Sequence, residues 1–285
     1  MTTKEKQELR SWLLQYIERA GSQNKAAALI GVSAATLSAV VNEQWERLGE
    51  EMLRKIVAVV RPVNAGGWQV VETSALRELF TAMSVAKSEA GCLWITAEAG
   101  SGKSTAARLF REQHREVFVL LCSEDMCKSD FVRGIADAIG LSHDGLTVRQ
   151  TLMAVAESLS RMEAPLLIFD EADKPGDNVF HYYIKLYNLL EEHCGLVFLS
   201  TNYIAKRLSC GLRCGKRGYK EIHSRIGRKL VELDPATAFD VVAICMANGI
   251  ADEQLQARIV REAEELDFDL RRVKKSIGRE KKLLR

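Results

Sequence analysis

The sequence predicts an α/β protein in which a parallel sheet lies between layers of helices, with a small helical domain before the sheet and a helical segment after it. Short apolar runs alternate with helical patterns through the middle of the chain, which is typical of a parallel sheet with helical crossovers. Residues 4–62 and the stretch from Pro235 onward have helical patterns only. The length of 285 residues, of which 47% are hydrophobic, suits one sizeable domain and one small domain.

Residues 1–62 are expected to form a helix-turn-helix domain. Within Gln23–Asn42, Gly31 falls at the turn between two helices and Ser33 can cap the second helix through its hydroxyl. This spacing resembles that of small repressor-like domains. The second helix contains no Arg, Lys or Gln, and only Asn42 is suited to reading a base. The domain is therefore expected to bind DNA weakly or to dock a protein, and not to act as a sequence-specific repressor.

Residues 63–68 are expected to be a linker, because Pro62 disfavours helix before it and Gly66-Gly67 loosens the chain. The core is expected to span residues 69–234, and residues 235–285 are expected to form a helical lid. The apolar runs that predict strands of the core are Cys92–Thr96, Val117–Leu121, Leu166–Phe169, Leu196–Ser200 and Lys229–Leu233.

A glycine-rich segment between the first predicted strand and the next helix has the pattern of a P-loop. Gly100 and Gly102 let the backbone turn so that its N–H groups face a phosphate. Lys103 can reach the outer phosphates, and Ser104 can ligate Mg²⁺. The motif therefore predicts ATP with Mg²⁺ as cofactors, bound by Gly100, Gly102, Lys103, Ser104 and Thr105.

The run Leu166–Asp173 completes the pattern of a nucleotide-hydrolysing site. Its four apolar residues predict a buried strand, which places Asp170 and Glu171 at the carboxyl end of that strand. Asp170 is expected to hold Mg²⁺ directly or through water, and Glu171 is expected to polarise the attacking water. The sequence thus predicts a Mg²⁺-dependent ATPase.

Later motifs resemble those of the AAA+ class of ATPases. Asn202 follows an apolar strand as the sensor 1 residue does, which implies that it orients water near the γ-phosphate. Ser224-Arg225-Ile226-Gly227 precedes the last strand where AAA+ proteins carry an arginine finger, which implies that Arg225 reaches a neighbouring subunit's nucleotide. Asp269-Leu270-Arg271 resembles sensor 2, which implies a phosphate contact by Arg271 in its own subunit. The resemblance implies an AAA+ P-loop NTPase fold.

A closer resemblance rests on domain order. A small helix-turn-helix domain, then Val71-Glu72-Thr73, the P-loop, Asp170–Asp173 and Ser224-Arg225-Ile226 follow one another. This order is similar to that of the ATP-dependent target-DNA activators of transposing phages such as Mu, which also resemble Tn7-type regulators. The resemblance implies ATP-promoted filaments on duplex DNA, little sequence preference, and delivery of target DNA to a transposase that stimulates hydrolysis.

The formal net charge is only +2, but two segments are strongly basic. Residues 203–230 hold nine Lys or Arg against one Glu, and residues 271–285 hold eight against one. Concentrated positive charge suggests a polyanion met at defined places. Residues 1–60 are nearly neutral, so the first basic segment is expected to hold the DNA. Its predicted phosphate contacts are Lys206, Arg207, Arg213, Lys216, Arg217 and Lys220.

These observations predict an ATP-dependent, largely non-sequence-specific DNA-binding ATPase that self-associates into an oligomer or filament and delivers target DNA to a transposase. Two alternatives stay open: a helicase-loader-like AAA+ ATPase of DNA replication, and an ATP-gated helix-turn-helix regulator. The N-terminus is too polar for a signal peptide, and no run approaches the ~18 apolar residues of a membrane helix. Seven scattered cysteines fit reduced thiols, so we expect a cytoplasmic protein without a membrane partner.

Overall fold

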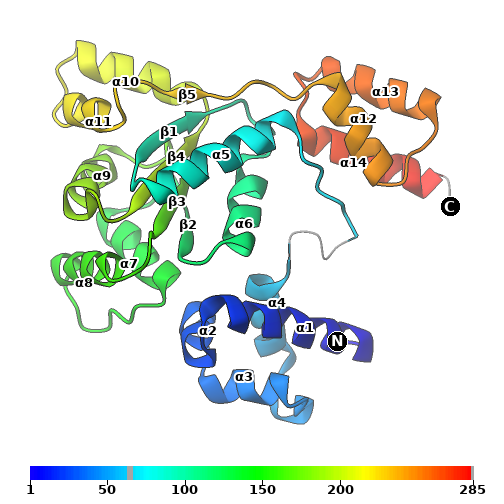
Figure 1. Cartoon of the computed structure of the whole chain (residues 1–285), viewed down its shortest axis with the longest axis horizontal. Helices are drawn as coiled ribbons and strands as arrows, with labels where there is room; N and C mark the ends of the chain where they lie inside the picture. The colour runs from blue at the N-terminus through cyan, green and yellow to red at the C-terminus, as the bar shows by residue number, and fades with distance from the viewer. Residues whose placement is uncertain (63–66, 284–285) are drawn as a thin grey trace.

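The structure, a computed structural model, describes residues 1–62 and 67–283. Residues 63–66 of the expected linker lie outside the described residues. Figure 1 shows three parts: an N-terminal helical domain, a central sheet covered by helices, and a set of C-terminal helices beside the sheet. The basic segment 203–230 includes two helices at the end of the sheet away from the C-terminal helices (Figure 1).

The N-terminal domain consists of helices around its own apolar core. Its elements are α1 (Thr3–Ala20), α2 (Gln23–Ile30), α3 (Ala34–Val41), the short 3-10 helix η1 (Trp45–Arg47) and α4 (Glu50–Val60). Gly31 turns the chain with a φ of +69°, and the Ser33 hydroxyl caps α3 by accepting from the Thr36 N–H at 3.1 Å. The helices on both sides of the turn agree with the sequence expectation, while a DNA-binding role for them stays a prediction.

Helix α3 lies on the side of the N-terminal domain farthest from the sheet (Figure 1). Its residues Leu37 and Val40 are buried in the domain core. Within residues 1–62 and 67–283 no single helix is long and apolar enough to cross a membrane; α2 and α3, bent by 110°, pass the length and composition test only as a pair.

The predicted parallel sheet between helices is confirmed. Its strands are β1 (Cys92–Thr96), β2 (Val117–Leu121), β3 (Leu166–Asp170), β4 (Gly195–Ser200) and β5 (Val231–Glu232). They lie in the order β2-β3-β4-β1-β5, and each adjacent pair is parallel. The last strand is shorter than the expected Lys229–Leu233. Because all strands run the same way, the segments that follow β1, β3 and β4 emerge at one edge of the sheet.

Side chains along each strand point alternately to the two faces of the sheet, and helices bury both faces. Leu166 and Ile168 of β3 pack with residues of α5 and α6, whereas Leu167 and Phe169 pack with residues of α7, α8 and α9. Trp94 of β1 joins the second face and donates its indole N–H to the Ser200 hydroxyl at 2.8 Å. The helices are α5 (Ser74–Ser88), α6 (Lys103–Gln113), α7 (Lys128–Ile139), α8 (Val148–Ser160) and α9 (Asp177–Leu190).

The remaining helices follow the last two strands. Helices α10 (Tyr203–Arg213) and α11 (Tyr219–Arg225) come after β4, and we call residues 203–225 the basic hairpin. After β5 come α12 (Ala238–Ala247), α13 (Glu253–Glu264) and α14 (Leu270–Leu283). These C-terminal helices share an apolar core that includes Val241, Ile259 and Val273. Trp68 and Val71, which precede the sheet in the chain, pack against that core.

Candidate nucleotide-binding site

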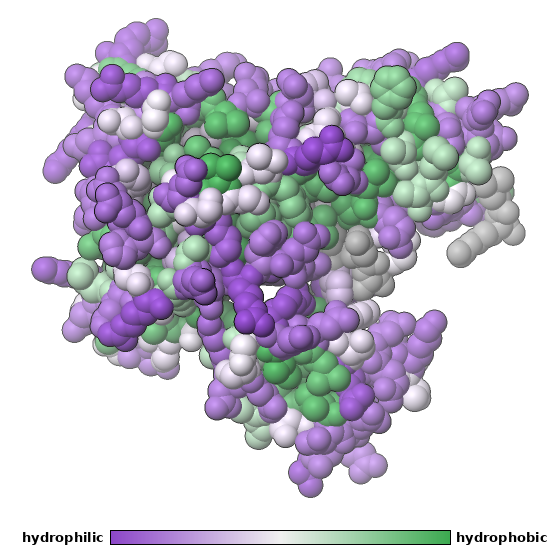
Figure 2. Space-filling view, in the orientation of Figure 1, coloured by the Kyte–Doolittle hydropathy of each residue, from purple (hydrophilic) through white to green (hydrophobic). Residues whose placement is uncertain are grey.

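A cleft of about 1510 Å³ is lined by the N-terminal domain, the sheet core and the C-terminal helices together. The surface is visibly hollowed between the N-terminal domain and the other two parts (Figure 2). The predicted site residues that line this cleft are Gly100, Gly102, Lys103, Ser104, Thr105, Asp170, Glu171 and Arg271. The fold thus brings the P-loop, the end of β3 and the start of α14 into one cavity.

The P-loop connects β1 to α6 and has the backbone conformation that its glycines predict. Gly100 and Gly102 have φ values of +82° and +93°, which side chains rarely adopt. A Cβ atom at Gly100 would lie 2.0 Å from Oδ1 of Asp269, and the Leu270 N–H donates to the Gly100 carbonyl at 3.1 Å. The start of α14, which carries the segment that resembles sensor 2, therefore rests directly on the P-loop.

Lys103 is folded over the P-loop. Its Nζ donates to the carbonyls of Ala97 and Glu98, each at 2.8 Å, and to the Ser101 hydroxyl at 3.1 Å. Burial lowers the pKa of Lys103, while the carboxylates of Asp170 and Asp173 oppose this change. The ammonium thus stands in a partly desolvated place, where an anionic ligand would gain more than it would in water.

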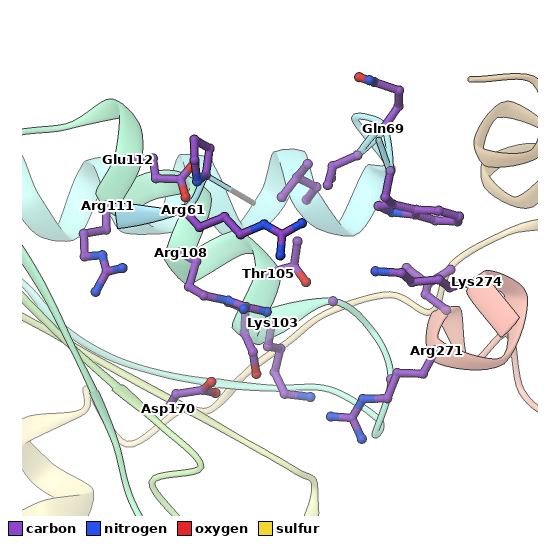
Figure 3. Close-up of a pocket in the computed structure, with 18 of the residues that line it drawn as sticks. Arg61, Gln69, Lys103, Thr105, Arg108, Arg111, Glu112, Asp170, Arg271 and Lys274 are labelled. Atoms are coloured by element: carbon purple, nitrogen blue, oxygen red, sulfur yellow. The ribbon is translucent and has the colours of Figure 1, made fainter. Parts of the chain in front are cut away.

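Three charged side chains converge from separate elements of the fold. Figure 3 shows Lys103 of α6, Asp170 of β3 and Arg271 of α14 pointing toward one another. Arg271 and not the adjacent Arg272 lines the cleft. Figure 3 also shows Arg108, whose Nε donates to the Ser104 carbonyl at 3.2 Å. Two cations and one carboxylate around a helix N-terminus suit a polyphosphate accompanied by a metal cation.

The end of β3 is held in a strained conformation. Asp170 is 6% exposed, and its Oδ1 accepts from the Glu171 N–H at 3.1 Å. Glu171 has a φ of +55°, a left-handed conformation that costs a residue with a side chain roughly 1–2 kcal/mol. The Ala172 N–H donates to the Leu199 carbonyl at 2.9 Å, so the adjacent strand β4 helps to hold this turn.

The residues at the cleft fit the expected Mg²⁺. Ser104 and Asp170 both line it, and they offer the hydroxyl and carboxylate oxygens that Mg²⁺ prefers. Among residues 1–62 and 67–283 there is no group of three or more His, Cys, Asp or Glu that could hold a metal. The oxygen donors therefore suit a cation that shares its coordination with nucleotide phosphates rather than one caged by protein alone.

Asn202 is not among the residues that line the cleft. Its Nδ2 donates to Oε1 of Glu98 at 3.0 Å and to Oε1 of Glu232 at 3.4 Å. The preceding residue Thr201 does line the cleft, and its hydroxyl donates to Oδ2 of Asp173 at 2.7 Å. The contact of Asn202 with attacking water stays a prediction, whereas Thr201 lines the cleft. The sequence offered Thr201 only as the neighbour of Asn202.

Arg225 also lies away from the cleft of its own chain. It ends α11, and its Nε and Nη2 donate to Oδ1 of Asn188 at 3.0 and 2.9 Å. Its guanidinium lies over the ring of Tyr187 at 5.4 Å. Within one molecule, Arg225 therefore has no contact with the nucleotide-binding residues described above, and a catalytic role would require a second molecule.

The basic hairpin presents most of its predicted DNA contacts to solvent. Its exposed members are Lys206, Arg213, Lys216, Arg217 and Lys220. Arg207 differs, because its side chain is only 13% exposed and its Nη2 donates to Oδ1 of Asp177 at 2.9 Å. The guanidinium of Arg207 thus already serves internal acceptors, which does not favour the phosphate contact predicted for it. We remove Arg207 from the candidate DNA surface.

An apolar wall of the cleft has no counterpart in the sequence motifs. Trp68 and Val71 line it from the segment before α5, and Ile244, Leu270 and Ile277 line it from the C-terminal helices. Apolar walls with a few polar groups are typical of small-molecule sites. The motif Val71-Glu72-Thr73 pointed to this segment, but not to its partners.

The nearby Glu72 and Thr73 have structural positions in the fold. The buried Thr73 hydroxyl caps α5 by accepting from the Leu76 N–H at 3.2 Å. Glu72 is exposed and accepts from Nε of Arg77 at 2.8 Å. The pair therefore fixes where α5 begins.

Comparison with known proteins supports an AAA core in this chain. Residues 86–208 match the family described as AAA domain, and the parallel sheet with its P-loop cleft is the AAA+ fold. The expected resemblance to phage target-DNA activators is confirmed. The chain is 24% identical over 269 residues to the ATP-dependent target DNA activator B of Escherichia phage Mu, and equally to that of Escherichia phage D108. Each alignment covers 89% of this chain and 83% of the relative.

Among solved structures, the fold is similar to that of the Aeropyrum pernix Orc1 protein in complex with DNA. The TM-score is 0.51 at 19% identity, and the match covers 81% of this chain. The chain spans only 61% of that Orc1 protein. This likeness shows the fold alone, whereas the AAA domain and the phage relatives support a DNA-related ATPase of the AAA+ class.

Proposed function

We propose that this protein is a Mg²⁺-dependent ATPase that, with ATP bound, assembles on duplex DNA and delivers it as a target to a transposase. The observation that supports this proposal most directly is the cleft at the end of the sheet. It is lined by Lys103, Asp170, Glu171 and Arg271. The basic hairpin begins three residues after β4, which ends at the same edge. The names of the phage relatives, which are ATP-dependent target DNA activators, support the same use.

In this proposal the P-loop holds the phosphates through its N–H groups and the N-terminus of α6. Lys103 leaves the carbonyls of Ala97 and Glu98 and turns to the outer phosphates. Ser104 and Asp170 would hold Mg²⁺, which when bound offsets the charge of the phosphate oxygens. Glu171 orients and polarises the attacking water, and Arg271 contacts phosphate from α14. The apolar wall around Trp68, Val71 and Ile277 is suited to the nucleobase.

In this proposal, hydrolysis needs an arginine that a second molecule supplies. Because Arg225 is held at Asn188 outside its own cleft, we propose that it acts on the nucleotide of an adjacent molecule, where an arginine offsets charge in the transition state. This requires an ATP-dependent oligomer, and a filament on DNA satisfies the requirement. The rate per molecule should then rise with protein concentration.

The exposed cations of the basic hairpin are the proposed DNA surface. Contacts to phosphates carry no sequence information, which fits a protein that accepts many targets. Helix α3 has no basic residue, so the regulator alternative, in which the N-terminal domain reads a specific sequence, has little physical support. The helicase-loader alternative predicts closed rings on single strands instead of filaments on duplex DNA.

Two variants test the proposed switch. Glu171→Gln should keep ATP binding, because Lys103 and Asp170 remain, but hydrolyse slowly and stay on DNA longer than the wild type. Lys103→Ala should lose ATP binding and ATP-dependent DNA binding together. Gel shifts with ATP, ADP and no nucleotide measure both effects. Normal DNA binding by Lys103→Ala in all three conditions would refute ATP control.

A further inference from the structure

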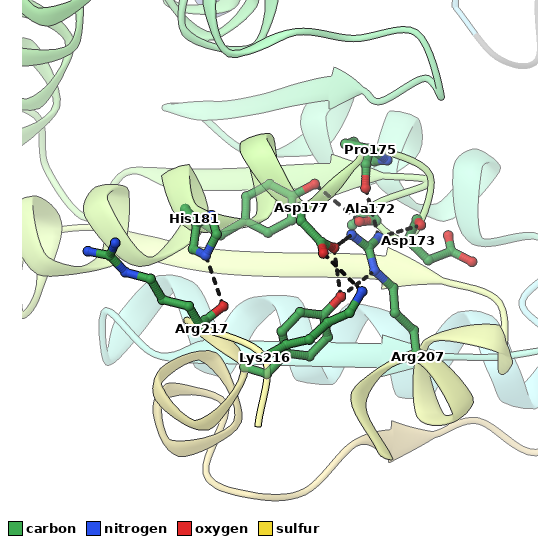
Figure 4. Close-up of polar contacts among 10 residues, drawn as sticks. Ala172, Asp173, Pro175, Asp177, His181, Arg207, Lys216 and Arg217 are labelled. Carbon is green, nitrogen blue, oxygen red and sulfur yellow. Dashed lines mark hydrogen bonds and ion pairs between the residues drawn. The ribbon is translucent and has the colours of Figure 1, made fainter. Parts of the chain in front are cut away.

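Arg207 connects the basic hairpin to the loop that follows β3, residues 171–176. Its Nη1 donates to the carbonyl of Asp173 at 2.9 Å and to that of Pro175 at 2.7 Å. Its Nη2 donates to Oδ1 of Asp177, the first residue of α9, at 2.9 Å. A single guanidinium from α10 therefore holds three successive points of the segment that starts at the Glu171 turn (Figure 4).

Asp177 also binds side chains from other parts of the basic hairpin. Its Oδ1 also accepts from the Tyr219 hydroxyl of α11 at 2.7 Å, and its Oδ2 accepts from Nζ of Lys216 at 3.2 Å. The Arg207 Nε donates to the Tyr219 hydroxyl at 3.2 Å. Both helices of the hairpin and the turn between them thus meet at one carboxylate, and we call Asp173, Asp177, Arg207, Lys216 and Tyr219 the Asp177 network.

Packing makes this network rigid. The Arg207 guanidinium lies over the ring of Phe180 at 4.4 Å, and Phe180 contacts the Tyr219 ring at 5.1 Å between centroids. Gly211 of α10 leaves room for Tyr219, since a Cβ atom at Gly211 would lie 2.0 Å from its Cδ1. The hairpin is therefore seated on α9 through close contacts and cannot shift independently of the loop that Arg207 holds.

The other end of the loop reaches the nucleotide cleft. Glu171 and Asp173 line the cleft, and the Thr201 hydroxyl donates to Oδ2 of Asp173 at 2.7 Å. A ligand that moves this loop moves the Asp173 and Pro175 carbonyls, and these are acceptors of Arg207. The nucleotide cleft and the basic hairpin are thus connected by residues 171–176 and by the side chain of Arg207.

We propose that Arg207 is a positioning residue that couples the state of the nucleotide cleft to the placement of the DNA-binding cations of the basic hairpin. This rests on the proposed function, because it assumes that the hairpin binds DNA. Coupling of this kind is reciprocal: if ATP raises the affinity for DNA by some factor, DNA raises the affinity for ATP by the same factor. That factor, and not DNA affinity itself, is what Arg207 controls.

Arg207→Lys tests the proposal at constant charge. Lysine keeps the formal charge at this position, but its single ammonium cannot hold Asp173, Pro175 and Asp177 in the fork geometry of a guanidinium. Tyr219→Phe is a milder second variant, because it removes only the hydroxyl and keeps the ring beside Gly211 and Phe180. The full-length protein is used for both, with thermal unfolding as the check that each variant folds.

The measurement is the affinity for a fluorescent duplex, with and without a non-hydrolysable ATP analogue, and the affinity for the analogue with and without duplex. Typical couplings are about 5- to 150-fold. Arg207→Lys should bring this factor close to 1, and Tyr219→Phe should reduce it to a smaller extent, while each variant still binds the analogue. Lys206→Gln is the control: it removes an exposed charge from the same helix, so DNA affinity should fall equally in both nucleotide states and the factor should persist.

The outcomes separate this inference from the function on which it rests. A wild type that binds duplex equally well with and without the analogue overturns the proposed function, and the coupling with it. A wild type with a clear coupling factor, unchanged in folded Arg207→Lys and Tyr219→Phe, overturns the role of Arg207 alone. Loss of the factor in Arg207→Lys and a smaller reduction in Tyr219→Phe, with Lys206→Gln retaining it, supports the proposal.

Discussion

Reversing two charges of the basic hairpin should weaken binding to every DNA sequence and reduce its dependence on salt. The best pair is Arg213→Glu with Arg217→Glu, because both residues are exposed. Lys216 is a poorer choice, since it pairs with Asp177 and its reversal would also disturb the Asp177 network. Sequence-independent weakening is expected because phosphate contacts do not distinguish bases.

The magnitude follows from the four exposed cations of the hairpin that do not pair with Asp177, which are Lys206, Arg213, Arg217 and Lys220. If each neutralises one phosphate, log K should fall with log salt concentration with a slope of about −3.6, which is about 150-fold in affinity between about 50 and about 200 mM salt. The double reversal removes two contacts and should leave a slope of about −1.8, or about 12-fold over the same range. Fluorescence anisotropy with two unrelated duplexes, titrated at several salt concentrations in the presence of the ATP analogue, measures both slopes.

A matched control separates local contact from net charge. Arg133→Glu with Arg149→Glu changes the formal charge equally, and these exposed residues belong to α7 and α8. The control should lower affinity slightly through the long-range field and leave the slope near that of the wild type. An unchanged slope in the hairpin variant, or the same reduction in the control, would refute the assignment of the DNA surface.

Three further predictions concern the cleft, assembly and pH. Gly100→Ala should abolish binding of the ATP analogue in calorimetry, because Gly100 has a φ of +82° and a Cβ atom there would lie 2.0 Å from Oδ1 of Asp269, just before α14. Gly145→Ala has a similar φ of +73° in open space, and it should lower the free energy of unfolding only by the backbone strain of about 1–2 kcal/mol. Mixing Arg225→Ala with Lys103→Ala should recover part of the ATPase rate, since one interface then joins an intact cleft to an intact arginine; no recovery at any mixing ratio would speak against a role between molecules. Contacts with Tyr219, Arg207 and Lys216 lower the pKa of Asp177 from 3.8 to about 2 although its burial opposes this, so its contribution to stability is complete above about pH 4 and is lost as the pH falls toward 2; Asp177→Asn should therefore show a shallower decline of the unfolding temperature over that range, and an equal decline would contradict the assigned contacts.

The parts of the fold that could be predicted are those whose cause is local in the sequence. The strand β3 is apolar at four successive positions because both faces of a parallel sheet are buried, and the charged pair Asp170-Glu171 marks its end. The P-loop could be predicted because its glycines, lysine and serine act within one turn of chain. Neither inference depends on what the chain does elsewhere.

The parts that could not be predicted depend on contacts between distant segments. The strand order β2-β3-β4-β1-β5 places β4 between β3 and β1. The hydrophobic periodicity of the sequence does not predict which strands are neighbours. The contact of Asp269 with Gly100 and the apolar wall formed by Trp68 and Ile277 arise only when the C-terminal helices fold back onto the P-loop. Thr201 lines the cleft although Asn202 beside it was the expected residue.

The basic segment shows why counting charge is not enough to identify a DNA surface. Lys206 and Arg207 are adjacent and carry the same formal charge, but they lie on different sides of α10. Lys206 is exposed to solvent, whereas Arg207 is turned toward a carboxylate and two carbonyls and lies over Phe180. A cation whose charge is already balanced inside the fold adds nothing to the attraction of phosphates, yet it can decide where its exposed neighbours stand. What distinguishes the two residues is the contact of Arg207 with Asp177, which lies some thirty positions earlier in the chain. Asp177 comes close to α10 only because β3 and β4 pair in the sheet.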